Sequence, residues 1–356
     1  MPLSAAAMVP PVASPTANLR LTIDRAALGA NWRWFARASG DAACGAAVKA
    51  DGYGLGAAAV VATLLEAGCR DFFVASWAEA AALGPLPDGA RLAVLHGVQD
   101  GEMDVALAST AVPVLSTPAQ VERWRAAAPG RSCDVMIDTG MNRLGLAPDE
   151  VGLLAGLAVD TVHSHLACAD TPGHPLNARQ LAAFRAVAAA VPARRYALAN
   201  SAGVALGRDY AFGLTRPGLG LYGGVPHPGM TGIVPVARPQ ARVVQVRTVA
   251  AGDSVGYGAT WSSPQPTRVA VLNIGYADGY FRGFSDRGTA RFGEHACPVI
   301  GRVSMDLLAV AIADAAVDEG DWLDIDFDLP TAAALSGLSQ YELLTGLGHR
   351  YQRSYK

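Results

Sequence analysis

Short apolar runs alternate along most of the chain with longer segments whose apolar residues recur at helical spacing. Residues 19–23 alternate apolar and polar positions and predict a strand, after which Asp24 stands where a helix N-cap is expected. From residue 42 the alternation becomes regular, with helix-like segments such as 56–67 and 177–190 between the apolar runs. Eight runs cover residues 42–49, 71–76, 91–96, 111–115, 133–138, 160–166, 196–200 and 211–216.

Eight strand-helix units in succession are the number found in a TIM barrel. A doubly wound open sheet is the competing arrangement, and its dinucleotide-binding form carries G-x-G-x-x-G after the first strand. Gly52, Gly54 and Gly56 follow the first run at a different spacing. We therefore predict an α/β fold with an N-terminal (β/α)8 TIM barrel.

Near residue 232 the helical segments stop, and short alternating runs follow at residues 242–249, 267–274, 297–303 and 307–313. Gly, Pro and Asp turns separate these runs, which is typical of antiparallel strands. We predict a flexible arm at residues 1–17, a barrel domain at 18–233 and a C-terminal mostly-β domain at 234–356. The strand at 19–23 can join this last domain, which is expected to end in a helix at 331–344 and a basic tail.

The composition is that of a protein with a large core and a small-molecule partner. With 356 residues, 51% of them hydrophobic and 17% charged, the chain is neither disordered nor a coiled coil. Its net charge of -3 gives no attraction to nucleic acid or to an anionic membrane. Five scattered cysteines without C-x-x-C favour reduced thiols in the cytoplasm and suggest no zinc site. We expect neither a secretory signal before Arg20 nor a membrane span.

Unusual polar residues fall where the predicted barrel strands end. They are Lys49, Asp138 with Arg143, His163 with His165, Asn200 with Ser201, and Arg216. Since the carboxyl ends of the strands form the catalytic face of a TIM barrel, these side chains are expected to meet there. Burial of Lys49 would lower its pKa and supply the neutral amine that attacks an aldehyde, whereas a rim lysine would keep its head group in water.

The stretch AVKADGYGLG at residues 47–56 resembles the lysine motif of the alanine racemase family, in which that lysine carries pyridoxal 5′-phosphate. Seven motifs in order, over residues 18–356, share the resemblance. It implies a cytoplasmic isomerase that interconverts L-alanine and D-alanine, for peptidoglycan synthesis or for catabolism. It also implies a homodimer with shared active sites.

Residues 138–145, DTGMNRLG, resemble a family motif whose arginine, here Arg143, reaches the phenolic oxygen of the cofactor and the substrate carboxylate. His165 resembles the histidine that bridges the cofactor arginine and a tyrosine. From the residues alone, Arg143 could be a solvated loop arginine and His163 a hydrogen-bonded core histidine. No acidic or cysteine cluster accompanies the histidine pair, so we expect no metal site.

The loops after the last two barrel strands, which often hold phosphate in TIM barrels, match the cofactor-binding segments of the family. Arg216 resembles the residue that binds the pyridine nitrogen, and a permanently cationic partner weakens the ring as an electron sink. The remaining cofactor contacts implied by the resemblance, mostly to the phosphate, are Tyr53, Asn200, Ser201, Gly218, Leu219 and Tyr222.

The second domain carries the other half of the resemblance. Tyr257, in VGYGATW, matches the family tyrosine that acts as a second base opposite Lys49, because racemisation needs a base on each face of the substrate. Without the resemblance, Tyr257 would be a turn residue and Met305 a core residue. Met305 is implied at the substrate carboxylate, and the implied gate residues are Asp170, Tyr276, Arg282 and Arg302.

Two positions depart from the family pattern. Met136 stands where many members carry a lysine that becomes carbamylated and braces the arginine, and His349 stands where some members have a gate tyrosine. The sequence also leaves open a serine or broad-specificity racemase of the same fold, because one methylene discriminates by only about 1 to 3 kcal/mol. A non-catalytic pyridoxal-phosphate carrier or a fold-related decarboxylase would not need Tyr257.

Overall fold

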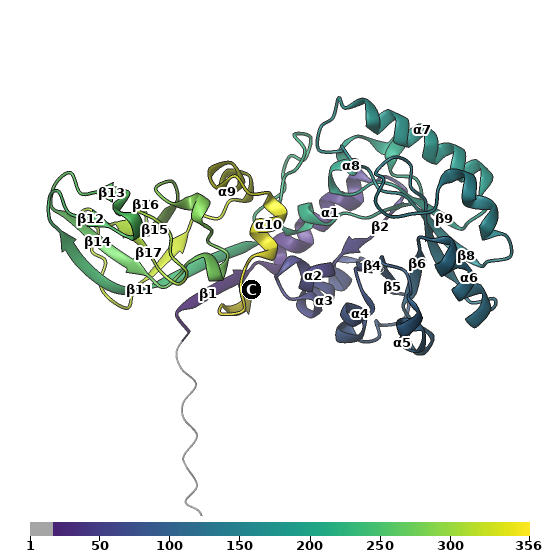
Figure 1. Cartoon of the computed structure of the whole chain (residues 1–356), viewed down its shortest axis with the longest axis horizontal. Helices are drawn as coiled ribbons and strands as arrows, with labels where there is room; N and C mark the ends of the chain where they lie inside the picture. The colour runs from purple at the N-terminus through teal and green to yellow at the C-terminus, as the bar shows by residue number, and fades with distance from the viewer. Residues whose placement is uncertain (1–16) are drawn as a thin grey trace, which may run out of the picture.

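The computed structural model describes residues 17–356 and arranges them in two domains joined by a narrower region (Figure 1). The arm predicted at residues 1–17 lies outside the described residues except for its last position. Within residues 17–356, no helix has the length and apolar character needed to cross a membrane.

Among the described residues, the first domain is a barrel of parallel strands. Seven strands pair in sequence order from β3 to β9, while β10 pairs with β2, which Gly45 alone separates from β3. Backbone bonds from Gly213 N to the Tyr196 carbonyl and from Arg216 N to the Ala199 carbonyl join β9 to β10 and close the ring. The predicted barrel is therefore confirmed. Its strands are β2 (Ala43–Cys44), β3 (Ala46–Ala47), β4 (Asp71–Val74), β5 (Arg91–Val94), β6 (Val112–Leu115), β7 (Cys133–Met136), β8 (Val159–His163), β9 (Arg195–Ala197) and β10 (Leu214–Thr215).

Helices cover the outside of this barrel, and all four residues of β4 and of β7 are buried. Asp24 caps the first helix by accepting the N–H of Ala27, as its position in the sequence predicts. The helices are α1 (Arg25–Ala38), α2 (Lys49–Tyr53), α3 (Ala57–Ala67), α4 (Trp77–Leu83), α5 (Met103–Ala108), α6 (Pro118–Ala127), α7 (Pro175–Ala190) and α8 (Ser201–Ala205), with 3-10 turns η1 (Asp100–Glu102), η2 (Pro148–Leu154), η3 (Arg208–Tyr210) and η4 (Leu219–Tyr222).

The second domain is a closed antiparallel barrel. Its strands follow the order β14, β17, β16, β15, β18, β11, and β11 also pairs with β14. The strands are β11 (Ala237–Val249), β14 (Thr267–Leu272), β15 (Thr289–Phe292), β16 (His295–Ile300), β17 (Leu308–Ala311) and β18 (Trp322–Ile325). A small hairpin of β12 (Ser254–Val255) and β13 (Trp261–Ser262) flanks η5 (Tyr257–Ala259), and η6 (Tyr276–Asp278) and η7 (Arg282–Phe284) follow β14.

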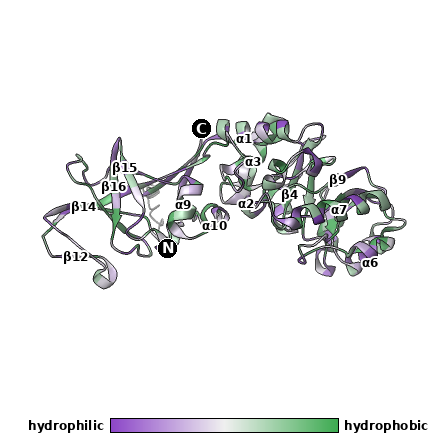
Figure 2. Cartoon of the chain, turned by 90° about the horizontal axis from the view of Figure 1, so that it is seen from above, coloured by the Kyte–Doolittle hydropathy of each residue, from purple (hydrophilic) through white to green (hydrophobic). Residues whose placement is uncertain are grey.

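The first and last strands of residues 17–356 pair with each other beside β11. Strand β1 (Leu19–Ile23) pairs with β11, and β19 (Gln352–Tyr355) pairs with β1 in parallel, so the expected basic tail is instead a strand. The single helix predicted at residues 331–344 is wrong, since α9 (Leu329–Ser336) ends at Gly337 in the left-handed region and α10 (Gln340–Thr345) follows. Figure 2 shows α9 and α10 at the junction of the two lobes.

Candidate active site

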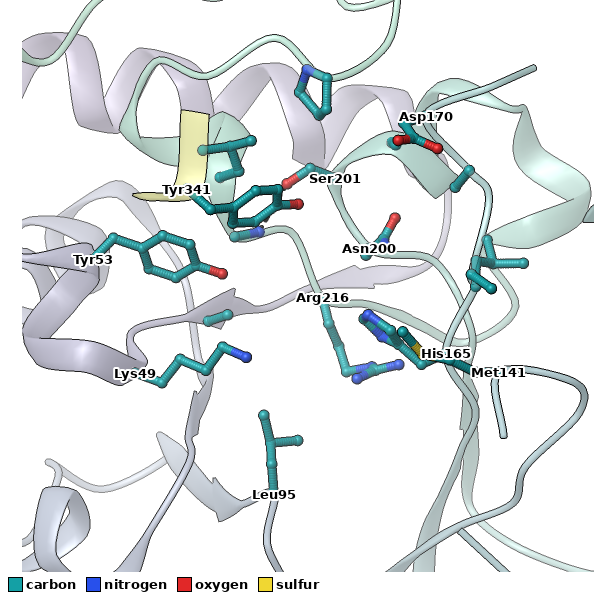
Figure 3. A pocket seen from close by; sticks show the side chains of 18 of the residues that line it. Lys49, Tyr53, Leu95, Met141, His165, Asp170, Asn200, Ser201, Arg216 and Tyr341 are labelled. Atoms are coloured by element: carbon teal, nitrogen blue, oxygen red, sulfur yellow. Dashed lines mark hydrogen bonds between the residues drawn. The ribbon is translucent and has the colours of Figure 1, made fainter. Parts of the chain in front are cut away.

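A cavity of about 390 Å³ opens at the carboxyl end of the barrel strands. Ten of the residues singled out from the sequence line it, and Figure 3 shows most of them pointing into it: Lys49, Tyr53, Arg143, His165, Asp170, Asn200, Ser201, Arg216, Gly218 and Leu219. They come from five different strand ends. The convergence follows from the parallel barrel, which brings all these ends to one face.

The segment after β3 has an unusual backbone that places two of these side chains. Lys49 follows Val48, whose N–H donates to the carbonyl of Phe73 on β4. The next four residues all have positive φ, at 53° for Ala50, 52° for Asp51, 61° for Gly52 and 56° for Tyr53. The chain therefore makes a turn of left-handed helix, and both Lys49 and Tyr53 project into the cavity (Figure 3).

Three cationic side chains share the cavity. Burial lowers the pKa of Lys49, and the positive charges of Arg143 and Arg216 lower it further. Among the described residues that line the cavity, Asp170 is the one carboxylate, and it is exposed. This charge distribution favours an anionic ligand and a lysine that readily gives up its proton.

Arg216 and His165 form the inner wall. The guanidinium of Arg216, whose pKa burial lowers to about 10, donates from Nη2 to the Ser164 carbonyl, while its Nε has no partner among the described residues. Burial first, and then the charges of Arg216, Arg143 and Lys49, lowers the pKa of His165 to about 3. His165 is therefore a neutral imidazole beside a cation at physiological pH.

The opposite end of the cavity offers the hydroxyl groups of Ser201 and Tyr53 as donors. Ser201 Oγ accepts the N–H groups of Gly218 at 2.9 Å and Gly220 at 3.1 Å, and the Asn200 side chain caps α8 through the N–H of Gly203. A side chain at Gly218 would overlap the Tyr53 hydroxyl, so the backbone approaches the cavity closely there. Neutral donors of this kind suit a phosphate group.

Tyr222 differs from its expected position. It is fully buried, its ring stacks on Tyr53 at 4.6 Å between centroids, and its hydroxyl donates to the Ala47 carbonyl at 2.8 Å. Since this bond uses its proton and the residue lies outside the cavity lining, Tyr222 supports Tyr53 instead of facing the ligand space.

The remaining predicted residues lie in the second domain, and in the described chain none of them lines the Lys49 cavity. Tyr257 is 69% exposed and Met305 is 53% exposed. Tyr257 and Arg302 border a separate depression of about 410 Å³, and the Arg282 guanidinium lies 5.4 Å from the centre of the Tyr276 ring. The β12 and β13 strands that flank Tyr257 lie at the end of the molecule remote from the parallel barrel of the first domain (Figure 1).

Two residues at or behind the cavity wall were not anticipated from the sequence. Tyr341 on α10 lines the cavity, with its ring 6.3 Å from that of Tyr53, whereas His349 lies exposed in the turn beyond that helix. Gln180 on α7 is fully buried and donates to the carbonyl of His165 at 2.9 Å. The capping box at Ser339 marks the start of α10 and so indicated that Tyr341 is helical. No residue near Gln180 in the sequence indicated its hydrogen bond to His165.

Three further positions bear on the alternatives left open. His163 is a buried core histidine, 3.0 Å from Asp134, which also receives a fork of hydrogen bonds from Arg91. Met136 is buried on β7, and the Arg143 guanidinium makes no hydrogen bond to the described residues. Within residues 17–356, no three His, Cys, Asp or Glu side chains group as metal ligands.

Two family models match the chain, the alanine racemase N-terminal domain over residues 23–226 and the alanine racemase C-terminal domain over residues 236–355. The chain belongs to the alanine racemase family. A catabolic alanine racemase of Agrobacterium fabrum is 43% identical, over 95% of this chain and 92% of its own length, and the biosynthetic alanine racemase of that organism is 41% identical, over 95% and 94%. The crystal structure of the Bartonella henselae alanine racemase with covalently bound pyridoxal phosphate superposes with a TM-score of 0.88 at 35% identity, covering 96% of this chain and all of that one.

Proposed function

We propose that this protein interconverts L-alanine and D-alanine with pyridoxal 5′-phosphate held covalently by Lys49. The observation that carries the proposal is the position of Lys49, whose pKa is lowered in a cavity that it shares with Arg143 and Arg216. When bound, the cofactor withdraws electrons from the substrate α-carbon and makes the α-proton acidic. The reaction supplies D-alanine for peptidoglycan or consumes it.

The residues present fit this cofactor. Arg216 lines the cavity, and its buried Nε, which has no partner among the described residues, would donate to the ring nitrogen, while Arg216 stays cationic at neutral pH. At the other end, Ser201, Leu219 and the Tyr53 hydroxyl would hold the phosphate, and the absence of a side chain at Gly218 leaves room for it. Asn200 would act through the cap of α8, and Tyr222 through its contact with Tyr53.

The proton transfers would need one base on each face of the substrate. Lys49 would exchange a proton on one face, and Tyr257 of the partner subunit would do so on the other. His165 and Arg216 would position that tyrosine and favour its phenolate, because one is neutral and the other cationic. Arg143 would hold the substrate carboxylate with a two-pronged contact.

We infer a homodimer because Tyr257 and Met305, which match the second base and the residue at the substrate carboxylate, are exposed and lie outside the Lys49 cavity of their own chain. A symmetric head-to-tail pair would bring both residues to the Lys49 cavity of the other chain, with Met305 at the substrate carboxylate. The same placement would set Tyr276, Arg282 and Arg302 of the second domain opposite Asp170 as the gate. The five free cysteines support a reducing cytoplasmic location.

The first test is to map the lysine. The sequence contains two lysines, Lys49 and Lys356. Borohydride reduction of the cofactor-loaded protein should leave the pyridoxyl group on the Lys49 peptide. Lys49→Arg should abolish labelling and the formation of D-alanine from a panel of L-amino acids, while Lys356→Arg should leave both intact. Labelling at Lys356, or a D-product from serine in preference to alanine, would overturn the assignment.

The second test concerns the shared site. Lys49→Ala and Tyr257→Phe should each abolish most activity, but a purified heterodimer of the two carries one intact site and one doubly altered site. Its activity should return to roughly half that of the wild-type dimer if the two sites are independent. Heterodimers as inactive as their parents would show that Lys49 and Tyr257 act within one chain.

A further inference from the structure

The left-handed turn that carries Lys49 and Tyr53 is conformationally unfavourable. Ala50, Asp51 and Tyr53 are not glycines, and each adopts a φ between 52° and 56°. In a left-handed helix the Cβ of an L-residue crowds the following carbonyl oxygen, so such residues normally occur singly. A run of this kind persists where the surrounding structure over-determines it. Contacts from outside the turn must therefore hold it.

Its internal hydrogen bonds leave one end open. The N–H of Gly52 donates to the Val48 carbonyl and that of Gly54 to the Ala50 carbonyl, both at 2.8 Å, which closes the turn. The N–H of Ala50 comes too early to find an acceptor inside it, as at the start of any helix. Its acceptor is Oε1 of Glu79 on α4, at 2.7 Å.

The second oxygen of Glu79 holds the neighbouring strand end. Oε2 accepts the N–H of Ala75 at 2.6 Å and that of Ser76 at 3.4 Å, directly after β4. One half-buried carboxylate therefore ties the start of the Lys49 turn to the end of the adjacent barrel strand. Its negative charge also acts on Lys49, where it opposes the effect of burial on the lysine pKa.

A capping role explains only part of this arrangement. Ser76 and Glu79 form a capping box at the start of α4, in which Ser76 Oγ accepts the Glu79 N–H and Oε2 of Glu79 accepts the Ser76 N–H. That box needs one carboxylate oxygen. The bond from Oε1 to Ala50 lies outside it and leads to a residue 29 positions away in the sequence.

We propose that Glu79 is a positioning residue that holds the left-handed turn and so fixes the Lys49 amine and the Tyr53 hydroxyl in the cofactor cavity. The consequence for catalysis rests on the function proposed above. The bond from Ala50 to Glu79 does not require the cofactor, so its effect on the turn can be measured in the apoprotein.

The main variant is Glu79→Gln, which keeps the size of the side chain but offers one acceptor oxygen in place of two. The remaining oxygen makes more hydrogen bonds facing the N–H groups of Ala75 and Ser76 than facing that of Ala50, so Ala50 is expected to lose its acceptor. We expect kcat to fall and the Kd for pyridoxal phosphate to rise, each by about 10- to 100-fold, since a displacement near 1 Å in a reacting group can cost 10²-fold. The KM for alanine should be unchanged, because Glu79 does not line the substrate cavity.

The matched control is Ser76→Ala, which removes the other half of the capping box and leaves the bond to Ala50 in place. It should lower the melting temperature without changing the cofactor Kd or kcat. If Glu79→Gln behaves like Ser76→Ala, with a loss of stability alone, Glu79 is only a helix cap and the proposal is wrong.

Two measurements separate this proposal from the proposed function. In the apoprotein, hydrogen exchange at the Ala50 amide should become faster in Glu79→Gln and stay unchanged in Ser76→Ala, whatever the lysine does. Adding Ala50→Gly to Glu79→Gln removes the Cβ crowding and should restore folding or cofactor affinity, by roughly tenfold in Kd. If exchange at the Ala50 amide is the same in Glu79→Gln as in the wild type, or if Ala50→Gly restores nothing, Glu79 does not position the turn and the proposal is wrong.

Discussion

Gly218→Ala is a minimal change that tests how firmly Tyr53 is fixed in the cavity. A Cβ at Gly218 would overlap the Tyr53 hydroxyl, lie 3.0 Å from Tyr53 Cζ and lie 3.4 Å from the Cβ of Ala47. The φ of Gly218 is −130°, outside the left-handed region, so the contact with Tyr53 is the feature under test.

The size of the effect depends on whether Tyr53 can move away. The residue is 6% exposed, and its ring stacks on Tyr222, whose hydroxyl is anchored on the Ala47 carbonyl. Because close-packed neighbours yield little, relief of the overlap requires the hydroxyl to shift by about 1 Å. Overpacking of this kind costs about 1 to 3 kcal/mol, which corresponds to about a 5- to 150-fold weaker Kd if the cost appears in cofactor binding.

The assay is titration of the apoprotein with pyridoxal phosphate, with the melting temperature measured in parallel. Gly152→Ala is the control, since a Cβ there meets nothing within 4 Å. Tyr53→Phe removes the overlapping oxygen, so the double variant should bind better than the sum of the two single effects predicts. Cofactor affinity of Gly218→Ala equal to that of Gly152→Ala would refute the idea that Tyr53 is held against Gly218.

Three further outcomes are expected. Activity should not depend on carbon dioxide or bicarbonate, because a thioether at Met136 cannot be carbamylated, and a marked bicarbonate requirement would show that Arg143 is braced by a carbamate elsewhere. Arg216→Glu should raise transamination relative to racemisation by favouring a protonated cofactor ring, and an unchanged product ratio would count against this role. Burial lowers the pKa of His163 from 6.5 to about 4, so the unfolded chain binds the proton first and the free energy of unfolding should fall as the pH drops from 6.5 toward 4. Urea denaturation at pH 7 and pH 5 measures this, and greater stability at pH 5 would contradict it.

Much of the fold is encoded in local patterns. The eight apolar runs each overlap a barrel strand, because strands buried on both faces are mostly apolar. The exceptions in β4 and β7 are Asp71 and Asp134, and each pairs with an arginine. The grouping of Lys49, His165 and Arg216 in one cavity could also be anticipated, since parallel strands bring their carboxyl ends to one face. The division between 233 and 234 stays a prediction, although β1 lies in the sheet of the second domain.

The errors arose where distant parts of the chain decide the structure. Residues 352–355 form β19 because β1, from the other end of the sequence, offers them an edge. Tyr222 has a hydroxyl that could bind phosphate. In the folded chain, that hydroxyl instead donates its hydrogen bond to the Ala47 carbonyl of β3. Gly337 interrupts the predicted helix at 331–344 with a left-handed residue, which apolar spacing alone does not show.

The sequence by itself determined the order of the elements, the face on which the chemistry gathers and the residue types available to it. The spacing of apolar residues and the positions of strand ends are local properties of the sequence. They do not depend on how the two domains are arranged. Only the tertiary structure decided that Ala50 to Tyr53 turn left-handed against Glu79, and that Tyr341 on α10 lines the cavity while Tyr257 lies exposed outside it. These outcomes depend on contacts between residues far apart in the chain, which form as the chain folds and leave no periodic trace in the sequence.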